Sequence, residues 1–552
     1  MTRMEILTAA QMNAIDRDSG ERGVPVRVLM ENAGEAVAWF CREHYPGFPV
    51  LVLCGKGNNG GDGAVAARLL AEIQTPVRLV LLGSIEETQG DAASAFARAK
   101  ATQGLEFVEV KDEAPLREAI ADAHLIVDAV VGTGFKPPLR GLATVARDLI
   151  ATMKRPVVAV DLPSGWDADS TAQTSADENG VAQAFRADSV VTFVGPKMAH
   201  VFGHLTPGKT FGPIVVAPIG TPLESMPARA ELQWTGAAKR IAERPRDVNG
   251  NKGRFGHVLI VGGSLGKAGA PSMASVAAMR AGAGLTTAAV PRPVLSMVAG
   301  VAPELMCTPL EEKNGLSLEQ LEKEPLEKLL KGMTVVGIGP GLGQEGTTPE
   351  FVRAFVERVS LPMVIDADAL NALAGRTELL KRVANATDAK GKRRTIVLTP
   401  HPGEMARLVG SNVKEVEADR VGLARRFATE NGVTLVLKGW RTLVAHPDGR
   451  VAVNTTGNPA MAKGGSGDIL TGIVAAMLAQ YPEHVAEAVE AAVFLHGLAG
   501  DFATLAQDEH TVLATDTVDH LWQAFRARVV DEDGFTWIAG LAARSGIGSH
   551  DA

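Results

Sequence analysis

The sequence predicts an α/β protein of two domains, each built on a parallel β-sheet with helices on both faces. Short runs rich in Val, Ile and Leu alternate with Ala-rich helical stretches along most of the chain. These strands are apolar throughout, as in a sheet that is buried on both faces. The chain has 552 residues, enough for several domains' worth of core.

The strands follow one another in two series. The first series is "PVLVLCG", "PVRLVLLG", "HLIVDAVVG", "PVVAVDLPSG" and "DSVVTFVG". The second is "HVLIVGGS", "GLTTAAVP", "TVVGIGPG", "PMVIDADAL", "TIVLTPHPGE" and "VTLVLKG". Between the series, the proline-rich segment Ala217–Trp234 has no clear period and indicates a linker. We therefore expect domains at 1–222 and 232–528, followed by a tail, 529–552, of unknown role.

Composition and charge exclude several classes of protein. The net charge is −8 without a basic stripe, so nucleic acid is not an expected partner. Three distant cysteines form neither a disulfide framework nor a zinc motif. The start lacks the apolar core of a signal peptide, and no apolar run approaches the ~20 residues that cross a bilayer. We expect a cytoplasmic protein without a membrane partner.

The stretch "VLCGKGNNGGDGAVAARLL" reads as a strand, a glycine loop and a helix. Its glycines satisfy G-x-G-x-x-G, a pattern that can place a pyrophosphate at a helix N-terminus. The acidic ribose-binding residue of an ordinary dinucleotide site is missing at the end of the next strand. A tight turn without a ligand is the alternative, but Asn58, Asn59 and Asp62 favour a polar ligand.

Polar groups also follow two further strands of the first series. Asp128 and Lys136 flank one glycine-rich turn, and Asp161 and Ser164 follow the next strand. Each Asp alone could cap a helix. Because the carboxyl ends of parallel strands share one edge of the sheet, these groups together predict a ligand site.

The motifs "GNNGGDG", "VDAVVGTGF" and "VDLPSGWD" resemble the NAD(P)H-hydrate epimerase (YjeF-like) family over roughly residues 10–218. The resemblance implies a Rossmann-like three-layer αβα domain that interconverts the R and S epimers of hydrated NADH and NADPH. It implies that Asn59, Asp128 and Ser164 bind a potassium ion. The implied substrate-binding residues are Asn58, Asn59, Gly60, Gly61, Asp62, Gly132, Thr133, Gly134, Phe135, Lys136, Pro137, Pro138 and Asp161.

The chemistry of that reaction needs a proton carrier. Protonation of the hydroxyl beside the ring nitrogen lets it leave as water, and the planar cation takes water back on either face. Asp161 is the expected catalytic residue that donates and recovers the proton, with Lys136 assisting.

In the second half, "GNPAMAKGGSGDILTG" places a carboxylate, Asp468, where a glycine turn opens a helix. Seven motifs in order, from "FGHVLIVGGSLGKAGAPSMAS" to this one, resemble the ADP- or ATP-dependent NAD(P)H-hydrate dehydratase family over roughly residues 236–525. The resemblance implies a ribokinase-like α/β domain. In that pattern Asp468 is the catalytic base that deprotonates the attacking hydroxyl. We expect the helix dipole to lower its pKa; a plain N-cap is the alternative.

The same resemblance assigns two groups of residues. Substrate binding falls to Ala270, Gly341, His401 and Asp468. Nucleotide binding falls to Lys438, Gly439, Trp440, Arg441, Thr442 and Gly467. The donor is expected to be ADP, accompanied by magnesium, since phosphorylation makes the hydroxyl a better leaving group. Lys267, Ala460, Lys463 and Ser466 depart from the family pattern, and the two lysines could alter phosphate affinity.

Together the halves predict a bifunctional NAD(P)H-hydrate repair enzyme. It would epimerise NADHX and NADPHX and dehydrate the S epimer with ADP, giving NAD(P)H, AMP and phosphate. We expect it to be a homo-oligomer. The alternative is a ribokinase-like small-molecule kinase fused to a non-catalytic Rossmann-like module.

Overall fold

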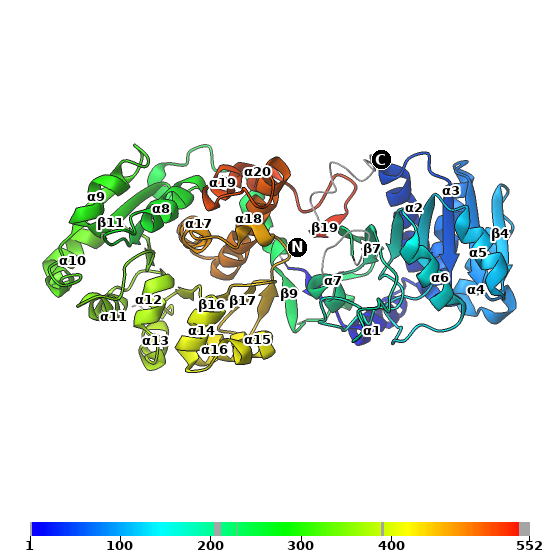
Figure 1. Cartoon of the computed structure of the whole chain (residues 1–552), viewed down its shortest axis with the longest axis horizontal. Coiled ribbons are helices and arrows are strands. Elements are labelled where there is room, and N and C mark those ends of the chain that lie inside the picture. The colour runs from blue at the N-terminus through cyan, green and yellow to red at the C-terminus, as the bar shows by residue number, and fades with distance from the viewer. Residues whose placement is uncertain (1–2, 204–210, 229, 388–390, 540–552) are drawn as a thin grey trace. The chain divides into compact units, whose positions relative to one another are not determined.

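The computed structural model describes residues 3–203, 211–228, 230–387 and 391–539. The chain divides into two compact units, drawn in Figure 1. The first unit comprises residues 5–230 and returns at Val529, and the second comprises Glu231–Arg528 with the residues before Glu5. Each unit is an α/β assembly around a mostly parallel sheet, so the predicted fold class is confirmed.

The first unit contains a sheet with strand order β19-β8-β7-β6-β5-β2-β3-β4. All neighbours pair in parallel except β19, which is antiparallel to β8. The short strand β1 spans Glu5–Ile6. The sheet strands are β2 (Val50–Cys54), β3 (Val77–Leu82), β4 (Leu105–Val110), β5 (Leu125–Ala129), β6 (Val157–Val160), β7 (Ser189–Phe193), β8 (Ile214–Ala217) and β19 (Thr536–Ala539).

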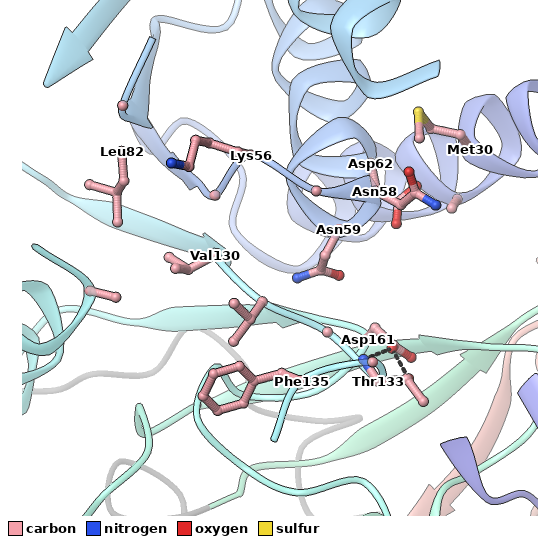
Figure 2. A pocket seen from close by; sticks show the side chains of 18 of the residues that line it. Met30, Lys56, Asn58, Asn59, Asp62, Leu82, Val130, Thr133, Phe135 and Asp161 are labelled. Carbon is pink, nitrogen blue, oxygen red and sulfur yellow. Dashed lines mark hydrogen bonds between the residues drawn. The ribbon is translucent and has the colours of Figure 1, made fainter. Parts of the chain in front are cut away.

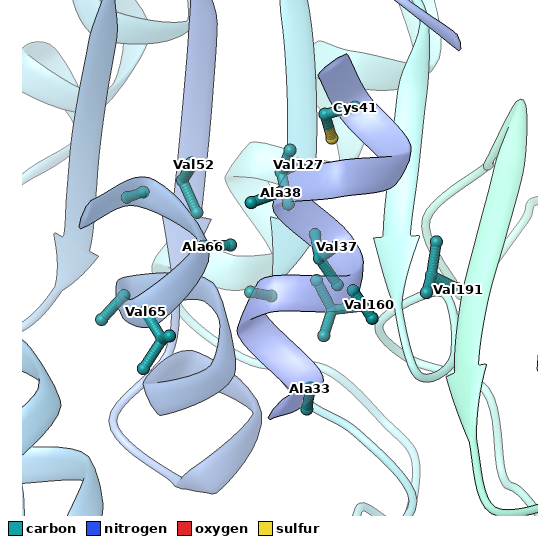
Figure 3. Close-up of a cluster of buried hydrophobic side chains, with 14 of the residues drawn as sticks. Ala33, Val37, Ala38, Cys41, Val52, Val65, Ala66, Val127, Val160 and Val191 are labelled. Carbon is teal, nitrogen blue, oxygen red and sulfur yellow. The ribbon is translucent and has the colours of Figure 1, made fainter. Parts of the chain in front are cut away.

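Helices cover both faces of this sheet. On one face, residues of α2, α3 and α4 form a cluster with the strands, as Figure 3 shows for valines such as Val37, Val52 and Val127. On the other face α5 and α6 pack against β2, β3, β5 and β6. The helices are α1 (Ala9–Glu21), α2 (Val26–His44), α3 (Asn58–Glu72), α4 (Gly90–Lys100), α5 (Glu113–Ala121), α6 (Leu142–Thr152) and α7 (Met198–Phe202).

The second unit contains the strand order β9-β18-β17-β16-β15-β14-β13-β10-β11-β12. Pairing is parallel from β16 through to β12, whereas β16, β17 and β18 form an antiparallel meander. The strands are β9 (Leu232–Trp234), β10 (His257–Val261), β11 (Leu285–Pro291), β12 (Met306–Leu310), β13 (Val335–Ile338), β14 (Met363–Ile365), β15 (Ile396–Leu398), β16 (Thr434–Leu437), β17 (Leu443–Ala445) and β18 (Val451–Val453).

Helix α17 lies in the core of this unit, in contact with α8, α18 and β13. Its residues are buried from Ile469 to Ala479, which explains why its sequence is apolar on all sides. The helices are α8 (Gly269–Arg280), α9 (Arg292–Ala299), α10 (Lys323–Leu330), α11 (Thr348–Arg358), α12 (Ala367–Ala372), α13 (Thr377–Ala384), α14 (Pro402–Val409), α15 (Val413–Ala418), α16 (Arg420–Asn431), α17 (Ser466–Gln480), α18 (Val485–Ala506), α19 (Ala514–Asp519) and α20 (Leu521–Arg526).

Two features differ from the sequence analysis. The segment after Arg528, to which the sequence assigned no role, supplies strand β19 at the edge of the first sheet. Helix α18 is long and apolar enough to cross a membrane by composition, but 78% of its most apolar window is buried inside the protein.

Candidate active sites

A cavity of about 920 Å³ opens at the carboxyl ends of β2, β3, β5 and β6 in the first unit (Figure 2). The first two turns of α3 supply Asn58, Asn59 and Asp62 to its lining, and the loop after β5 supplies Gly132–Phe135. Asp161 follows β6 directly and reaches the same cavity. The strand ends that the sequence singled out therefore converge on one space.

The glycines of the loop before α3 permit close packing. A Cβ on Gly55 would lie 2.0 Å from the carbonyl oxygen of Val130, and a Cβ on Gly60 would lie 1.9 Å from that of Gly55. Side chains at either position would push α3 away from the sheet. Glycine thus lets the N-terminus of α3, with its free N–H groups, approach the cavity.

Asp161 is held in place by a network of donors. It has a left-handed backbone, with φ 65°. Its carboxylate accepts hydrogen bonds from the hydroxyl and N–H of Thr133, the latter at 3.1 Å, and from the hydroxyl of Thr192 at 2.9 Å. The ammonium of Lys197, which is fully buried, lies 2.6 Å from Asp161 Oδ1.

The Lys197 ammonium determines the charge of Asp161. Burial opposes ionisation, but the charge and hydrogen bond of Lys197, aided by Thr133, outweigh it and hold the pKa of Asp161 well below its ordinary value. Lys197 also donates to the Thr192 hydroxyl at 2.7 Å and to the Phe193 carbonyl at 3.1 Å. Asp161 is therefore a fixed carboxylate at neutral pH.

Two other carboxyls that line this cavity have the opposite tendency. Burial, reinforced by the charges of Asp161 and Asp16, raises the pKa of Asp62 well above its ordinary value. Burial also raises the pKa of Asp16, although Lys197 counteracts part of the effect. The surroundings of these carboxyls thus shift their pKa values in opposite directions.

Lys136 does not occupy the position expected of it. Its ammonium forms ion pairs with Asp167 at 2.7 Å and Asp169 at 3.1 Å, and its side chain is 58% exposed. The cavity lining includes Gly132–Phe135 but leaves out Lys136–Pro138. The ammonium that contacts Asp161 belongs to Lys197, and the assistance expected from Lys136 stays a prediction.

Asp128 and Ser164 contact each other directly, and the Asn59 side chain lies against Gly132 in the loop after β5. The Ser164 hydroxyl donates to Asp128 Oδ1 at 2.6 Å, and the Ser164 N–H donates to Oδ2 at 2.8 Å. Burial raises the pKa of Asp128 to about 6 despite these bonds. The buried Asn59 Nδ2 has no hydrogen-bond partner among the described residues. Carboxylate, hydroxyl and amide oxygens suit a hard monovalent cation, so the donor set fits potassium.

In the second unit an ion-pair cluster lies beneath the N-terminus of α17. Lys438 Nζ is 3.0 Å from Asp366 Oδ1 and 3.8 Å from Glu404 Oε2. The Thr471 hydroxyl, one helical turn into α17, donates to Asp366 Oδ2 at 2.8 Å. A Cβ on Gly467 would lie 3.1 Å from Lys438 Nζ, so the ammonium sits against the first turn of the helix.

Asp468 is the third residue of α17, and its surroundings correct one expectation. We expected the helix dipole to lower its pKa. Instead burial and the neighbouring Asp366 charge raise the pKa to about 6, although Lys438 pulls in the other direction. Desolvation and the acidic neighbours outweigh the dipole and the cation.

A second cavity, of about 370 Å³, lies beside this cluster. All six residues predicted to bind the nucleotide line it, and Asn454, Asn458 and His496 complete part of its wall. The guanidinium of the buried Arg441 lies 4.3 Å from the centre of the Trp440 ring. The cavity thus combines an ammonium, a helix N-terminus and an aromatic surface.

Among the predicted substrate-binding residues of the second unit, Gly341 adjoins Ala270, and His401 lies near the Lys438 cluster. A Cβ on Gly341 would lie 3.0 Å from that of Ala270, so these residues adjoin. His401 caps α14, where its Nδ1 accepts the N–H of Gly403 at 3.0 Å. Its Nε2 is 3.6 Å from Glu404 Oε1, which links His401 through Glu404 to Lys438.

The two unusual lysines have different roles. Lys463 donates to the backbone carbonyls of Val512 and of His510, the latter at 2.8 Å, so it anchors the chain after α18. Lys267 is 3.3 Å from Asp368, which also accepts the N–H of Gly343 at 2.8 Å. Only Lys267, 53% exposed, remains placed to meet an anion near the Asp366 cluster.

The sequence analysis missed several residues of these sites. Lys197 follows β7 closely but carries no motif, and Asp16 lies in α1, far from the strand ends. Asp366 directly follows β14, and Glu404 lies in "HPGE", shortly after the next strand. Both could therefore have been predicted as site residues from their positions after strands. Glu87, shortly after β3, lines the first cavity and pairs with Lys56 at 2.6 Å.

Two α/β units, one with carboxyls lining its cavity and the other with a cavity beside a cluster of Asp366, Glu404 and Lys438, define a two-site acid–base enzyme. A family model of NAD(P)H-hydrate dehydratase matches residues 258–524, and one described as YjeF-related protein N-terminus matches residues 26–199. The chain is 40% identical over 530 residues to a bifunctional NAD(P)H-hydrate repair enzyme of Moorella thermoacetica, covering 94% of this chain and 96% of that one. The chain belongs to the family of bifunctional NAD(P)H-hydrate repair enzymes.

A second relative agrees with this membership. The Escherichia coli repair enzyme of the same name is 35% identical, with 93% of this chain and 92% of the relative covered. Among solved structures, the ADP/ATP-dependent NAD(P)H-hydrate dehydratase of Bacillus subtilis, co-crystallised with ATP and Mg²⁺, is 30% identical. It covers 52% of this chain and 96% of its own, with a TM-score of 0.42.

Proposed function

We propose that this chain repairs hydrated nicotinamide coenzymes in two steps. The first unit interconverts the R and S epimers of NADHX and NADPHX. The second unit dehydrates the S epimer, with ADP as phosphoryl donor, to NAD(P)H, AMP and phosphate. The observation that carries the proposal is that one chain, similar over 94% of its length to such an enzyme, has both the acid-lined cavity of the first unit and the second cavity, in which all six predicted nucleotide-binding residues meet.

In the first cavity, Asp161 acts as a permanent carboxylate. Departure of the hydroxyl as water leaves a planar ring cation, in which the ring nitrogen shares the positive charge. The ionised Asp161, fixed by Lys197 and Thr133, stabilises that cation without rearrangement of the site. The N-terminus of α3 and the loop Gly132–Phe135 hold the rest of the dinucleotide.

In the second unit, Asp468 accepts the proton of the substrate hydroxyl as that oxygen attacks the phosphoryl group. Its raised pKa makes it a stronger base than an ordinary carboxylate. Lys438 and the N–H groups of the first turn of α17 bind the phosphoryl oxygens. Phosphate then leaves together with the neighbouring ring proton, which regenerates the dihydropyridine.

The nucleotide is expected to bring magnesium with it. The described part of the chain has no group of three or more His, Cys, Asp or Glu residues that could hold a metal ion. Magnesium commonly binds through substrate phosphates, water and one or two carboxylates, so this does not conflict with such a role. The ion would supply charge neutralisation on the phosphates. Lys438–Thr442 and Gly467 would bind the nucleotide around it.

The function is tested with purified chain, ADP, Mg²⁺ and a mixture of both NADHX epimers. We expect the absorbance of NADH to appear. One AMP and one phosphate should form for each NADH. A small-molecule kinase would leave the absorbance unchanged. Replacing ADP with ATP in a parallel reaction determines the preferred donor.

Potassium in the first unit is a separate proposal, which rests on the oxygen groups of Asn59, Asp128 and Ser164. Replacement of KCl by choline chloride should lower the melting temperature of the first unit and its epimerase rate. The Asp128→Ala variant should show no difference between the two salts. An unchanged wild-type response to the salt exchange would refute the proposal.

The cellular setting is proposed from chemistry alone. Cys41, Cys54 and Cys307 are all free thiols, which suits the reducing cytoplasm. A homo-oligomer is expected, and light scattering on the purified chain decides it.

A further inference from the structure

The epimerisation chemistry needs a proton donor that the structure does not provide in Asp161. The departing hydroxyl must be protonated, because hydroxide is a poor leaving group. Asp161 is locked as a carboxylate by the buried ammonium of Lys197 at 2.6 Å and by three hydroxyl and N–H donors. A group in this state stabilises positive charge but does not carry a proton at neutral pH.

Asp62 and Asp16 are the two carboxyls of the cavity without a partner among the described residues, and the charge of Lys197 counteracts the raised pKa of Asp16 but not that of Asp62. Asp62 comes from the first turns of α3, on a different wall from Asp161 (Figure 2). No described residue forms a hydrogen bond or an ion pair with its carboxyl group. Its side chain is nevertheless half-buried and contributes to the cavity lining. An unpaired, half-buried carboxyl facing a cavity is placed to contact whatever fills that cavity.

The groups that surround Asp62 are acids. Asp161 and Asp16, from α1, line the same cavity and act on Asp62 as like charges. The positive charge of Lys197 lowers the pKa of both Asp161 and Asp16. Burial and these like charges raise the pKa of Asp62, so it keeps its proton when Asp161 has none.

We propose that Asp62 is the general acid of epimerisation, which gives its proton to the departing hydroxyl while the Asp161 carboxylate stabilises the cation. The carbon–oxygen bond breaks with its electron pair on oxygen, which leaves as water with the Asp62 proton. The ring nitrogen donates its lone pair to form the C=N bond. A water molecule then adds to the other face, and its released proton returns to Asp62, so the enzyme is restored.

The arrangement follows a general rule of acid–base sites. Two carboxyls whose surroundings push their pKa values apart supply the protonated and the ionised group that one reaction needs. Here Lys197 fixes the ionised group, and Asp16 with Asp161 favours the protonated one. The inference rests on the proposed epimerase activity, and it adds a role for Asp62 beyond substrate contact.

The test uses Asp62→Asn in the full-length chain, with interconversion of R and S NADHX followed by chromatography. We expect kcat to fall by about 100-fold or more, as for loss of a general acid, with KM changed by no more than about threefold. Asp62→Glu should recover part of kcat. Dehydration of S-NADHX with ADP by the same protein serves as the control for intact protein and should be unchanged.

The pH profile supplies a second measurement that does not depend on folding of the asparagine variant. Wild-type kcat should fall as pH rises through the raised pKa, because the acid must be protonated. Asp16→Asn removes a like charge, so this fall should move to lower pH. If Asp62→Asn retains more than a third of wild-type kcat, or if wild-type kcat does not fall with rising pH, the assignment is wrong. If wild type does not interconvert the epimers at all, the proposed function itself fails.

Discussion

Asp161 and Asp468 show how neighbouring charges divide the roles of similar carboxyls. Both follow glycine-rich or strand-end motifs, and both are largely buried. Lys197 contacts Asp161 directly at 2.6 Å and keeps it ionised. Lys438 is instead held at 3.0 Å by Asp366, so Asp468 feels the excess of negative charge and its pKa rises to about 6. One site thus has a permanent anion and the other a titratable base.

The raised pKa of Asp468 predicts the pH dependence of dehydration. A base must be deprotonated, so kcat should rise with pH through about 6 and level off above about 7. Asp468→Asn should lower kcat by roughly 100- to 10,000-fold and remove this rise. NADH absorbance with S-NADHX and ADP measures both effects. A wild-type rate that falls between pH 5 and pH 7 would contradict the role as base.

The buried ion pair of Lys197 and Asp161 predicts a loss of stability. Lys197→Met leaves the Asp161 carboxylate without its cation, which should cost about 3–5 kcal/mol in the first unit. Calorimetry of the full chain measures this as a lower melting temperature of that unit. Adding Asp161→Asn to the Lys197→Met variant should restore part of the loss. Strictly additive effects of the two changes would show that the pair is not coupled.

At the residue scale the sequence located acids better than their partners. Asp128, Asp161 and Ser164 follow strands, and parallel topology brings strand ends together, so their convergence was predictable. Lys197 lies after β7 in "GPKMAH", where no period or motif marks it. The contact between its ammonium and Asp161 depends on the tertiary structure and could not be predicted from a local motif. Lys136 follows a recognisable motif, and its assistance to Asp161 stays a prediction, whereas the contact of Lys197 with Asp161 had no such signal.

At the scale of elements, the contact between α8 and α17 depends on a missing side chain. A Cβ on Gly472 would lie 2.0 Å from the carbonyl oxygen of Ala274, which is backbone and cannot move aside cheaply. Gly472→Ala should therefore destabilise the second unit by about 1–3 kcal/mol. Gly269→Ala is the matched control, since a Cβ there meets nothing within 4 Å and should be neutral or slightly stabilising. Equal melting temperatures of the two variants would disprove the packing argument.

Strand β19 belongs to the first unit although it lies at the other end of the chain. It pairs with β8, and Trp537 contributes to the same cluster as Phe40. This pairing was not predictable from the sequence, because β19 has only four residues and its partner strand, β8, lies more than 300 residues upstream. Residues 540–552 of the predicted tail lie outside the described residues.

This placement predicts that a change near the C-terminus destabilises the first unit. Trp537→Ala removes a side chain that is only 5% exposed and should cost about 3–5 kcal/mol. Trp522→Ala, at a side chain 58% exposed, should change stability by less than about 1 kcal/mol. Calorimetry measures the loss of stability. The temperature at which epimerase activity is lost on heating shows whether the first unit is the one affected. If Trp537→Ala lowered only the temperature at which dehydratase activity is lost, the assignment of β19 to the first unit would be wrong.

At the scale of the whole molecule, the fold class was predictable because both sheets are buried on two faces, which makes their strands continuous apolar runs. The function was predictable because the motifs stand at the ends of these strands. The domain boundaries were harder to predict, because the first unit is built from two separate segments of the chain. Each unit nevertheless has its own core and its own cavity.

Two sites in one chain predict separable defects with a mixed-epimer substrate. A dehydratase specific for one epimer leaves the other behind, because a chiral site discriminates between them. Wild type with ADP should convert both epimers to NADH. Asp161→Asn should convert the S share at the normal rate and leave the R share, since the cation of the first step loses its carboxylate. Asp468→Asn should interconvert the epimers without forming NADH.

Mixing the two variants completes this test. Each variant retains the activity that the other lacks, and the hydrate diffuses between molecules, so the mixture should again convert both epimers. Chromatography of R and S NADHX beside NADH absorbance follows all three species. If the Asp161→Asn variant drained both epimers as fast as wild type, epimerisation would not depend on the first cavity. If the mixture stopped at the S share, the hydrate would have to pass between sites within one molecule.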